Sequence, residues 1–333
     1  MELNVSGRPA LVVGGDARAA TQAACLIDAG AVVTIVAPTV TPTIDDLASR
    51  GLLTWHDRDV ELNDLHHAAV VMTGHDPAPA LDRIVGVGSV TLVGGGPGDP
   101  GLVTVARREA IERADVIVTD RLAPLAALAW ARPDAEIIDV AKIPGGRSTS
   151  QEEINRLLVE HAKSGRHVVR FKGGDSFVFG RGGEELIACL DAGIEATVVP
   201  GVTSAIPAPP MAGIPVTHRG LTQGFTVISG HVAPGHPDST LDHTALARSG
   251  STIIVLMGVR TLGAICSALA DGGLDPHTPA AVVADGAMPS QRVVRATLAT
   301  IDEVATAAGL GAPAVAVIGA VADIEGLTSG TDA

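Results

Sequence analysis

The sequence predicts an α/β protein with a small N-terminal unit and a larger part made of two sub-domains. Runs rich in Val and Ile alternate with helical patterns, as in parallel sheets with right-handed crossovers. Hydrophobic residues make up 46% of the chain, whereas aromatic residues make up 2%, so aliphatic side chains must form the core. The alternation restarts at Ser89, after Gly86-Val87-Gly88. We expect boundaries at 1–87, 88–212 and 213–328.

Composition excludes several classes of protein. The formal charge of −14 disfavours a nucleic-acid partner. No apolar run reaches the roughly 18 residues that span a bilayer, and the N-terminus lacks a signal-peptide pattern. Cys25, Cys189 and Cys266 lie far apart, which indicates reduced, buried thiols without a disulfide framework. We therefore expect a cytoplasmic protein that does not associate with membranes.

The N-terminal unit is predicted to be a small β-α-β alternation. A glycine pair, Gly14-Gly15, follows its first strand, and Gly30 ends its first helix. The expected strands are 9–13, 31–37, 52–56 and 68–72, and the expected helices are 17–29 and 44–49.

The two sub-domains of the larger part are predicted in the same way. In the first, Thr149 or Ser150 is expected to cap a helix whose first turn carries Glu152 and Glu153. Its strands are 90–93, 115–119, 136–140, 167–171 and 195–199, and its helices are 104–113, 122–130, 151–164 and 183–192. The second begins near Gly213, with strands 225–229, 252–257, 280–284 and 314–319 and helices 242–248, 261–270 and 301–308.

The most informative loop is Gly94–Pro100, with the sequence GGGPGDP, between a predicted strand and a helix. It looks at first like a dinucleotide-binding fingerprint. However, Asp99 stands where helix–strand packing needs a small residue, and Pro97 removes an N–H from the middle of the loop. The loop therefore indicates close approach of the backbone to a ligand other than a pyrophosphate.

Other candidate residues also follow strands, where ligands of parallel sheets bind. Asp120 is either a general base or the N-cap of the helix at 122–130. Lys142 is either a functional cation or a solvated loop charge. The sequence Lys172–Asp175, KGGD, combines two glycines with a carboxylate that can accept hydrogen bonds.

Several long blocks, in order and correctly spaced, now indicate a family. They include VTLVGGGPGDPGLVT (90–104), VVRFKGGDSFVFGRGGEE (168–185), VVPGVTSA (198–205) and GIPVTHRG (213–220). From Ser89 to about residue 325 the chain resembles the tetrapyrrole methylase family, and within it the uroporphyrinogen-III C-methyltransferases. The resemblance implies two α/β sub-domains with S-adenosylmethionine held in the cleft between them. It also implies methylation of uroporphyrinogen III at C2 and C7, giving precorrin-2 by way of precorrin-1, for siroheme or cobalamin biosynthesis, and release of S-adenosylhomocysteine.

The resemblance also assigns roles. Asp120 corresponds to the proton acceptor and Lys142 to the proton donor. Met257 would otherwise be a core residue of an apolar strand. The residues that the resemblance places at the cofactor are Pro97, Gly173, Gly174, Asp175, Val178, Thr203, Ser204, Met257 and Gly286.

The first 85 residues resemble the NAD-binding part of the precorrin-2 dehydrogenase/ferrochelatase module of siroheme synthases, through GRPALVVGGD (7–16) and AGAVVTIVAP (29–38). The unit is predicted to be Rossmann-like but degenerate. Asp16 replaces the second glycine of the fingerprint and would repel a pyrophosphate. The Thr-Asp pair of the module, after strand 68–72, reads Thr73-Gly74 here, so the expected acid/base carboxylate is missing unless Asp76 substitutes. NAD binding is therefore doubtful. A multifunctional siroheme synthase with dehydrogenase and ferrochelatase activity, and a non-enzymatic interaction module, stay open as alternatives.

Partners follow from the same reasoning. The tetrapyrrole substrate carries eight carboxylates, which arginines in or beside the cleft loops can bind. The histidines lack metal-ligand spacing, so no metal site is expected. A homodimer is expected from the resemblance. The candidate substrate-binding arginines are Arg121, Arg147, Arg170, Arg181 and Arg219.

Overall fold

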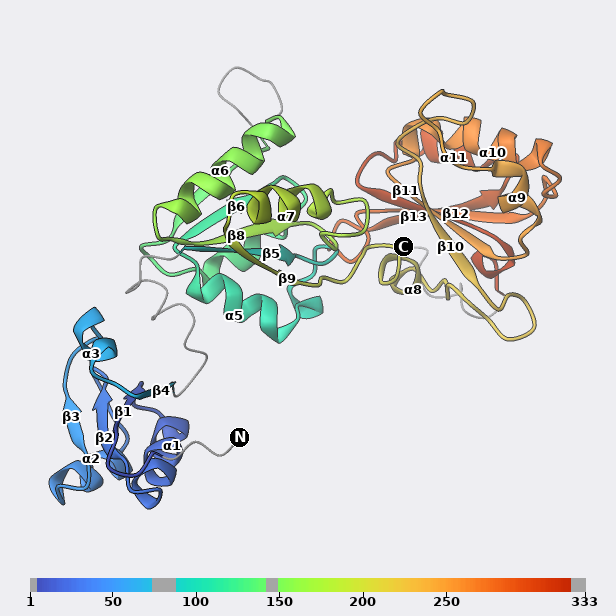
Figure 1. Cartoon of the computed structure of the whole chain (residues 1–333). Coiled ribbons are helices and arrows are strands. Elements are labelled where there is room, and N and C mark those ends of the chain that lie inside the picture. The colour runs from blue at the N-terminus through green and yellow to red at the C-terminus, as the bar shows by residue number, and fades with distance from the viewer. Residues whose placement is uncertain (1–4, 74–87, 142–148, 325–333) are drawn as a thin grey trace. The chain divides into compact units, whose positions relative to one another are not determined.

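The computed structural model describes residues 5–73, 88–141 and 149–324 (Figure 1). The chain divides into two compact units, Met1–Val90 with Val159–Val168, and Thr91–Leu158 with Val169–Ala333. Among the described residues, no helix is long and apolar enough to cross a membrane. Some residues named above lie outside the described ranges: Gly74, Asp76, Lys142 and Arg147.

The N-terminal sheet has the strand order β3-β2-β1-β4, and all of its strand pairs are parallel. Small side chains such as Ala19 and Ala23 let helix α1 pack closely on Val12 and Ile35. The short helix α3 was not predicted. The elements are β1 (Pro9–Val13), α1 (Ala17–Asp28), β2 (Val32–Val36), α2 (Pro42–Ser49), β3 (Thr54–His56), α3 (Leu62–His66) and β4 (Val70–Thr73).

The next sheet along the chain has five strands, in the order β7-β6-β8-β5-β9. Ser150 accepts a hydrogen bond from Glu153 N–H and so caps α6, as predicted. The strands are β5 (Ser89–Gly94), β6 (Val116–Thr119), β7 (Glu136–Asp139), β8 (His167–Lys172) and β9 (Glu195–Val199). The helices are η1 (Pro100–Leu102), α5 (Val105–Arg113), η2 (Leu125–Trp130), α6 (Gln151–Lys163) and α7 (Gly182–Asp191).

Successive side chains of β8 point to opposite faces of this sheet. Val169 and Phe171 pack in a cluster with Ile111 of α5. Arg170 and Lys172 therefore point to the other face, where Figure 1 shows α6 and α7. Both cations are buried.

The predicted helix at 122–130 is wrong in part, because only Leu125–Trp130 is helical and it is a 3₁₀-helix. Pro124 precedes it with ψ 89°. Proline lacks an N–H and restricts the residue before it, so an α-helix cannot run through this position.

The last sheet has the order β10-β11-β14-β12-β13. It is mixed, because β10 pairs with β11 in parallel, whereas the other neighbouring strands pair antiparallel. Helices α9, α10 and α11 cover one face and α8 the other (Figure 1). Strand β13 and helix α8 were not predicted. The elements are α8 (Ala208–Met211), β10 (Phe225–Ser229), α9 (His243–Arg248), β11 (Thr252–Leu256), η3 (Val259–Thr261), α10 (Leu262–Asp271), β12 (Pro279–Ala284), β13 (Arg292–Thr297), α11 (Ile301–Ala307), β14 (Ala314–Ile318) and η4 (Ala320–Ala322).

Candidate active site

Backbone hydrogen bonds join the glycine loop after β5 to the KGGD turn after β8. Gly96 N–H donates to Gly174 O at 3.0 Å, and Gly174 N–H donates to Gly96 O at 2.7 Å. Gly95 N–H donates to Lys172 O. Pro97 follows directly in the same loop. Two of the predicted cofactor segments therefore meet at one edge of the sheet.

The loop after β9 joins the same edge through Asp175. Its Oδ2 accepts from Gly201 N–H at 2.9 Å, and its Oδ1 accepts from Phe177 N–H at 2.8 Å. A Cβ on Gly201 would lie 2.2 Å from Gly174 O, so no side chain fits there. Thr203 and Ser204 follow in this loop and are half-buried. The three segments form one backbone-rich surface.

Asp120 lies beside this surface, at the end of β6. Its Oδ2 accepts from Arg170 Nη2 at 3.0 Å, its Oδ1 accepts from Leu122 N–H at 3.1 Å, and 26% of its side chain is exposed. The carbonyl of Leu122 lies 2.3 Å from where a Cβ on Gly173 would be. The alternative of a helix N-cap is wrong, because no α-helix follows; the carboxylate closes a turn instead.

The second half of the larger unit approaches the glycine loop through residues 285–288. A Cβ on Gly98 would lie 2.7 Å from Met288 Cγ, and one on Gly286 would lie 2.5 Å from Ala208 Cβ. Asp285 and Ala287 have φ 50° and 66°, a region that non-glycine residues rarely adopt. Backbone outliers of this kind gather at functional sites, and Gly286 lies between these two residues in the chain.

Met257 and Val178 have different surroundings. Met257 is 49% exposed with φ 57°, so the alternative of a core residue is wrong. No hydrogen bond among the described residues joins it to the loops of the first half. Val178 is partly buried and packs against the cluster on the α8 face of the last sheet.

A buried ion network between β8 and α7 was not predicted from the sequence. Arg170 Nε donates to Glu185 Oε1 at 3.0 Å, and Lys172 Nζ donates to Glu185 Oε2 at 2.9 Å. Glu185 is fully buried. Burial lowers the pKa of Lys172 below its usual range, although Glu185 opposes the shift. Two features of the sequence point to this network. Two cations alternate with apolar residues in HVVRFK (167–172), and two acidic residues follow the glycines in GGEE (182–185).

The network corrects one expectation. The side chain of Arg170 is 4% exposed and pairs with two carboxylates, so it is not available to a substrate carboxylate. Arg121 and Arg219 are exposed. Arg181 is also accessible, and it pairs with Glu184 at 2.6 Å.

A third buried cation, Arg107, lies next to the glycine loop. Its guanidinium lies 6.0 Å from the ring of Trp130 and 5.8 Å from that of Phe171. Burial lowers the pKa of Arg107 to about 10. Its Nη1 lies 3.2 Å from where a Cβ on Gly96 would be, so this side chain packs against the backbone of the loop.

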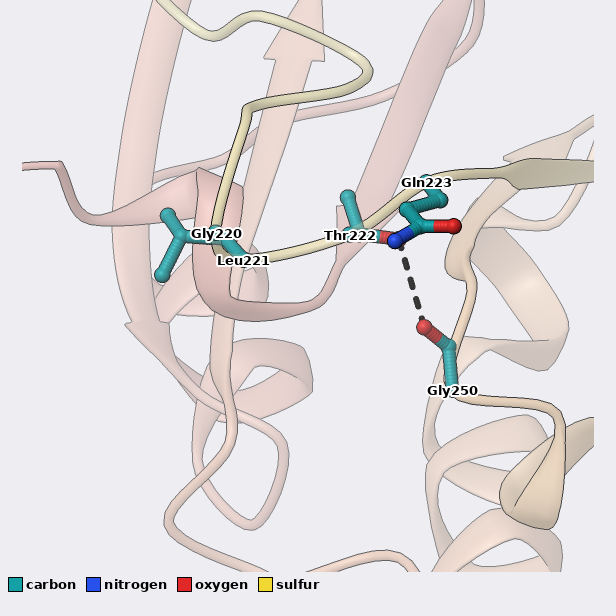
Figure 2. Close-up of a pocket in the computed structure, with 5 residues that line it drawn as sticks. All are labelled: Gly220, Leu221, Thr222, Gln223 and Gly250. Atoms are coloured by element: carbon teal, nitrogen blue, oxygen red, sulfur yellow. Dashed lines mark hydrogen bonds between the residues drawn. The ribbon is translucent and has the colours of Figure 1, made fainter.

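A pocket of about 330 Å³ lies at the start of the last sheet (Figure 2). Thr222 Oγ1 donates to Gly250 O at 3.2 Å across it. None of the expected site residues lines it. The lining residues are Gly220, Leu221, Thr222, Gln223 and Gly250, so no charged side chain is present to bind a carboxylate.

Within the ranges the structure describes, no cluster of three His, Cys, Asp or Glu side chains could hold a metal ion. Cys189 and Cys266 are buried, and burial raises their pKa values to about 11 and about 12. Cys25 is exposed, which corrects the expectation of a buried thiol.

In the N-terminal unit, Asp16 occupies the start of α1. Its Oδ1 accepts from Ala19 N–H at 2.8 Å. A dinucleotide pyrophosphate would use the same N–H groups at the helix N-terminus. A carboxylate therefore already lies where the phosphate would bind.

Comparison with known proteins identifies the family of the larger part of the chain. The profile of the family described as Tetrapyrrole (Corrin/Porphyrin) Methylases matches residues 89–302. The chain belongs to the tetrapyrrole methylase family. In this tetrapyrrole methylase, residues 1–87 match a second family, described as Putative NAD(P)-binding.

Named relatives are similar over most of the methylase part. The S-adenosyl-L-methionine-dependent uroporphyrinogen III methyltransferase of Methanosarcina barkeri is 48% identical over 234 residues, 70% of this chain and 92% of that one. A crystal structure of a Thermus thermophilus uroporphyrin-III C-methyl transferase, complexed with S-adenyl homocysteine, is 40% identical, with a TM-score of 0.58, and covers 70% of this chain and 98% of that one. A siroheme synthase of Thiobacillus denitrificans is 40% identical over 276 residues, 83% of this chain but 56% of that one.

Proposed function

We propose that this tetrapyrrole methylase transfers methyl groups from S-adenosylmethionine to C2 and C7 of uroporphyrinogen III, giving precorrin-2 by way of precorrin-1. The supporting observation is the 48% identity to a methyltransferase named for this substrate and donor, over 92% of its length. The joined loops at the sheet edge are consistent with it, because they offer backbone groups and small side chains to a ligand.

The proposed cofactor site includes a glycine with open space beside its backbone. A Cβ on Gly174, which has φ 67°, would meet nothing within 4 Å, so space is open beside its backbone. S-adenosylmethionine supplies a methyl group on a sulfonium, which an electron-rich pyrrole carbon can take up to leave S-adenosylhomocysteine. The residues proposed to hold it are Pro97, Gly173, Gly174, Asp175, Val178, Thr203, Ser204, Met257 and Gly286.

Proton transfer falls to Asp120 in this proposal. A neutral ring that gains a methyl cation must lose a proton to become neutral again. Each oxygen of Asp120 accepts one hydrogen bond from the protein and keeps another lone pair, and the side chain is partly exposed. It can therefore accept that proton as a general base. Lys142, the proposed proton donor, remains a prediction.

An anaerobic incubation tests the proposal. The purified protein is mixed with uroporphyrinogen III and S-adenosylmethionine, and the product is identified by mass spectrometry and absorbance. We expect the mass of two added methyl groups and two equivalents of S-adenosylhomocysteine. Unchanged substrate would refute the proposal, and a single product methylated elsewhere would change the site of reaction.

Replacing Gly173 with alanine tests the tight packing of the site. Its Cβ would lie 2.3 Å from Leu122 O, so the turn must shift, at a cost of about 1–3 kcal/mol. We expect a lower melting temperature and weaker binding of S-adenosylhomocysteine by calorimetry. Gly183→Ala is the matched control, because a Cβ there meets nothing within 4 Å. Equal behaviour of the two variants would contradict the packing argument.

NAD is not proposed as a ligand of the N-terminal unit, because Asp16 caps α1. Asp16→Ala is expected to destabilise α1 by about 1 kcal/mol, seen as faster hydrogen exchange in its first turn. Wild-type protein is expected to show no saturable NAD binding by calorimetry. Tight binding would instead favour the multifunctional siroheme synthase.

Three further parts of the proposal await measurement. They are the boundaries at 1–87, 88–212 and 213–328, assembly as a homodimer, and location in the cytoplasm. Sedimentation of the full chain measures the second.

A further inference from the structure

The ion network extends from the fully buried Glu185 to the partly exposed Asp120. Three contacts of 3.0, 3.0 and 2.9 Å connect Asp120, Arg170, Glu185 and Lys172 in that order. Two anions and two cations balance. Exposure falls from 26% at Asp120 to 4% at Arg170 and 0% at Glu185. The network therefore ties the proposed base to the interior of the sheet.

Arg170 has little freedom to move within this network. Its Nη2 donates to Asp120 and its Nε to Glu185. Its Nη1 donates to Val118 O at 3.2 Å and Phe171 O at 3.3 Å. Because the guanidinium is a rigid planar fork, these contacts set the position of the nitrogen that holds Asp120.

Glu185 is the group on which this orientation depends. Its Oε1 accepts from Arg170 and also from Gln151 Nε2 at 3.3 Å, while its Oε2 accepts from Lys172. Lys172 also donates to Gly180 O, the carbonyl just before the turn into α7. The carboxylate is therefore held from α6 and β8, and Lys172 links it further to the loop before α7.

We propose that Glu185 is a positioning residue for methyl transfer: through Arg170 it fixes the carboxylate of Asp120 at the edge of the active site. The inference rests on the proposed function. Buried ion pairs commonly stabilise a fold no better than apolar side chains of the same volume. A positioning role explains why the network includes Asp120, a carboxylate that is partly exposed to solvent.

Glu185→Gln tests the inference, because it keeps the shape but places an amide NH₂ opposite one of the two cations. A displaced base is expected to lower kcat by about 100-fold. The KM for S-adenosylmethionine and the affinity for S-adenosylhomocysteine should stay within about two-fold, because the variant removes no ligand contact. Glu153→Gln, in an exposed ion pair with Arg156, is the control and should leave both unchanged.

A double-mutant cycle separates positioning from general stability. In an Asp120→Asn background, Glu185→Gln is expected to cause no further fall in the residual kcat. Losses that multiply would overturn the inference, as would an unchanged kcat or an equal loss of S-adenosylhomocysteine binding.

Arg170→Lys repeats the test if Glu185→Gln does not fold. It keeps the charge, but one ammonium cannot reproduce the fork between Asp120 and Glu185. We expect a lower kcat with unchanged S-adenosylhomocysteine binding; an unchanged kcat would overturn the inference. An inactive wild-type protein would refute the proposed function, whereas an active wild type with unimpaired variants would refute only the role of Glu185.

Discussion

Replacing Asp120 with asparagine is expected to lower the kcat for methylation of uroporphyrinogen III by about 10²–10⁴-fold, the usual contribution of a general base. Asparagine has nearly the same shape, and its side-chain oxygen can still accept from Leu122 N–H or Arg170. It cannot take up a proton at neutral pH. Binding of S-adenosylhomocysteine, measured by calorimetry, should therefore change little while turnover is lost.

Asp139 provides a matched control for this substitution. It ends β7, the strand paired in parallel with β6, and its Oδ1 accepts from Ala141 N–H at 2.8 Å, as Asp120 accepts from Leu122 N–H. Asp139→Asn therefore changes a similar turn and should keep most of the activity. If both variants lose turnover equally, or if Asp120→Asn also loses S-adenosylhomocysteine binding, Asp120 acts on the shape of the loop and not as a base.

The sequence predicted the strands that carry the site because their signals are local. Val- and Ile-rich runs such as Val90–Val93 end at glycine turns, and such turns at the ends of parallel strands meet at one edge. Strand β13 was missed because Arg292–Thr297 mixes charged and apolar residues without a clear alternation. The predicted helix at 122–130 fails at Pro124, because proline excludes an α-helix that runs through this position.

The role of Arg170 could not be predicted in the same way. From the sequence alone, an arginine near the end of a strand can bind a ligand or pair with an acidic side chain of the protein, and the choice depends on its neighbours in space. Those partners, Asp120 and Glu185, lie 50 and 15 residues away in sequence, on different elements. Only the fold brings them together, and it turns an expected substrate-binding arginine into a buried structural cation.

Arg170→Met is expected to destabilise the sheet by about 3–5 kcal/mol, the usual cost of removing one member of a buried ion pair. Methionine fills much of the volume, but Glu185 keeps only Lys172 as a cationic partner and Asp120 loses its ion pair. The chain has two units, so one unfolding curve need not be two-state. Trp130, which packs beside Phe171, can report on this sheet alone once Trp55 of the N-terminal unit is replaced by phenylalanine. Urea titration followed by Trp130 fluorescence then measures the change.

Arg156→Met is the comparison that gives this measurement its meaning. Arg156 also pairs with a glutamate, Glu153, at 2.7 Å, but its side chain is 56% exposed. Solvent screens such a pair, so its loss should cost only about 0–1 kcal/mol. A large difference between the variants would show that burial, not pairing as such, makes Arg170 indispensable to the fold. Equal, small effects would mean that Lys172 alone compensates Glu185, and the fixed orientation of Arg170 would then matter to turnover more than to stability.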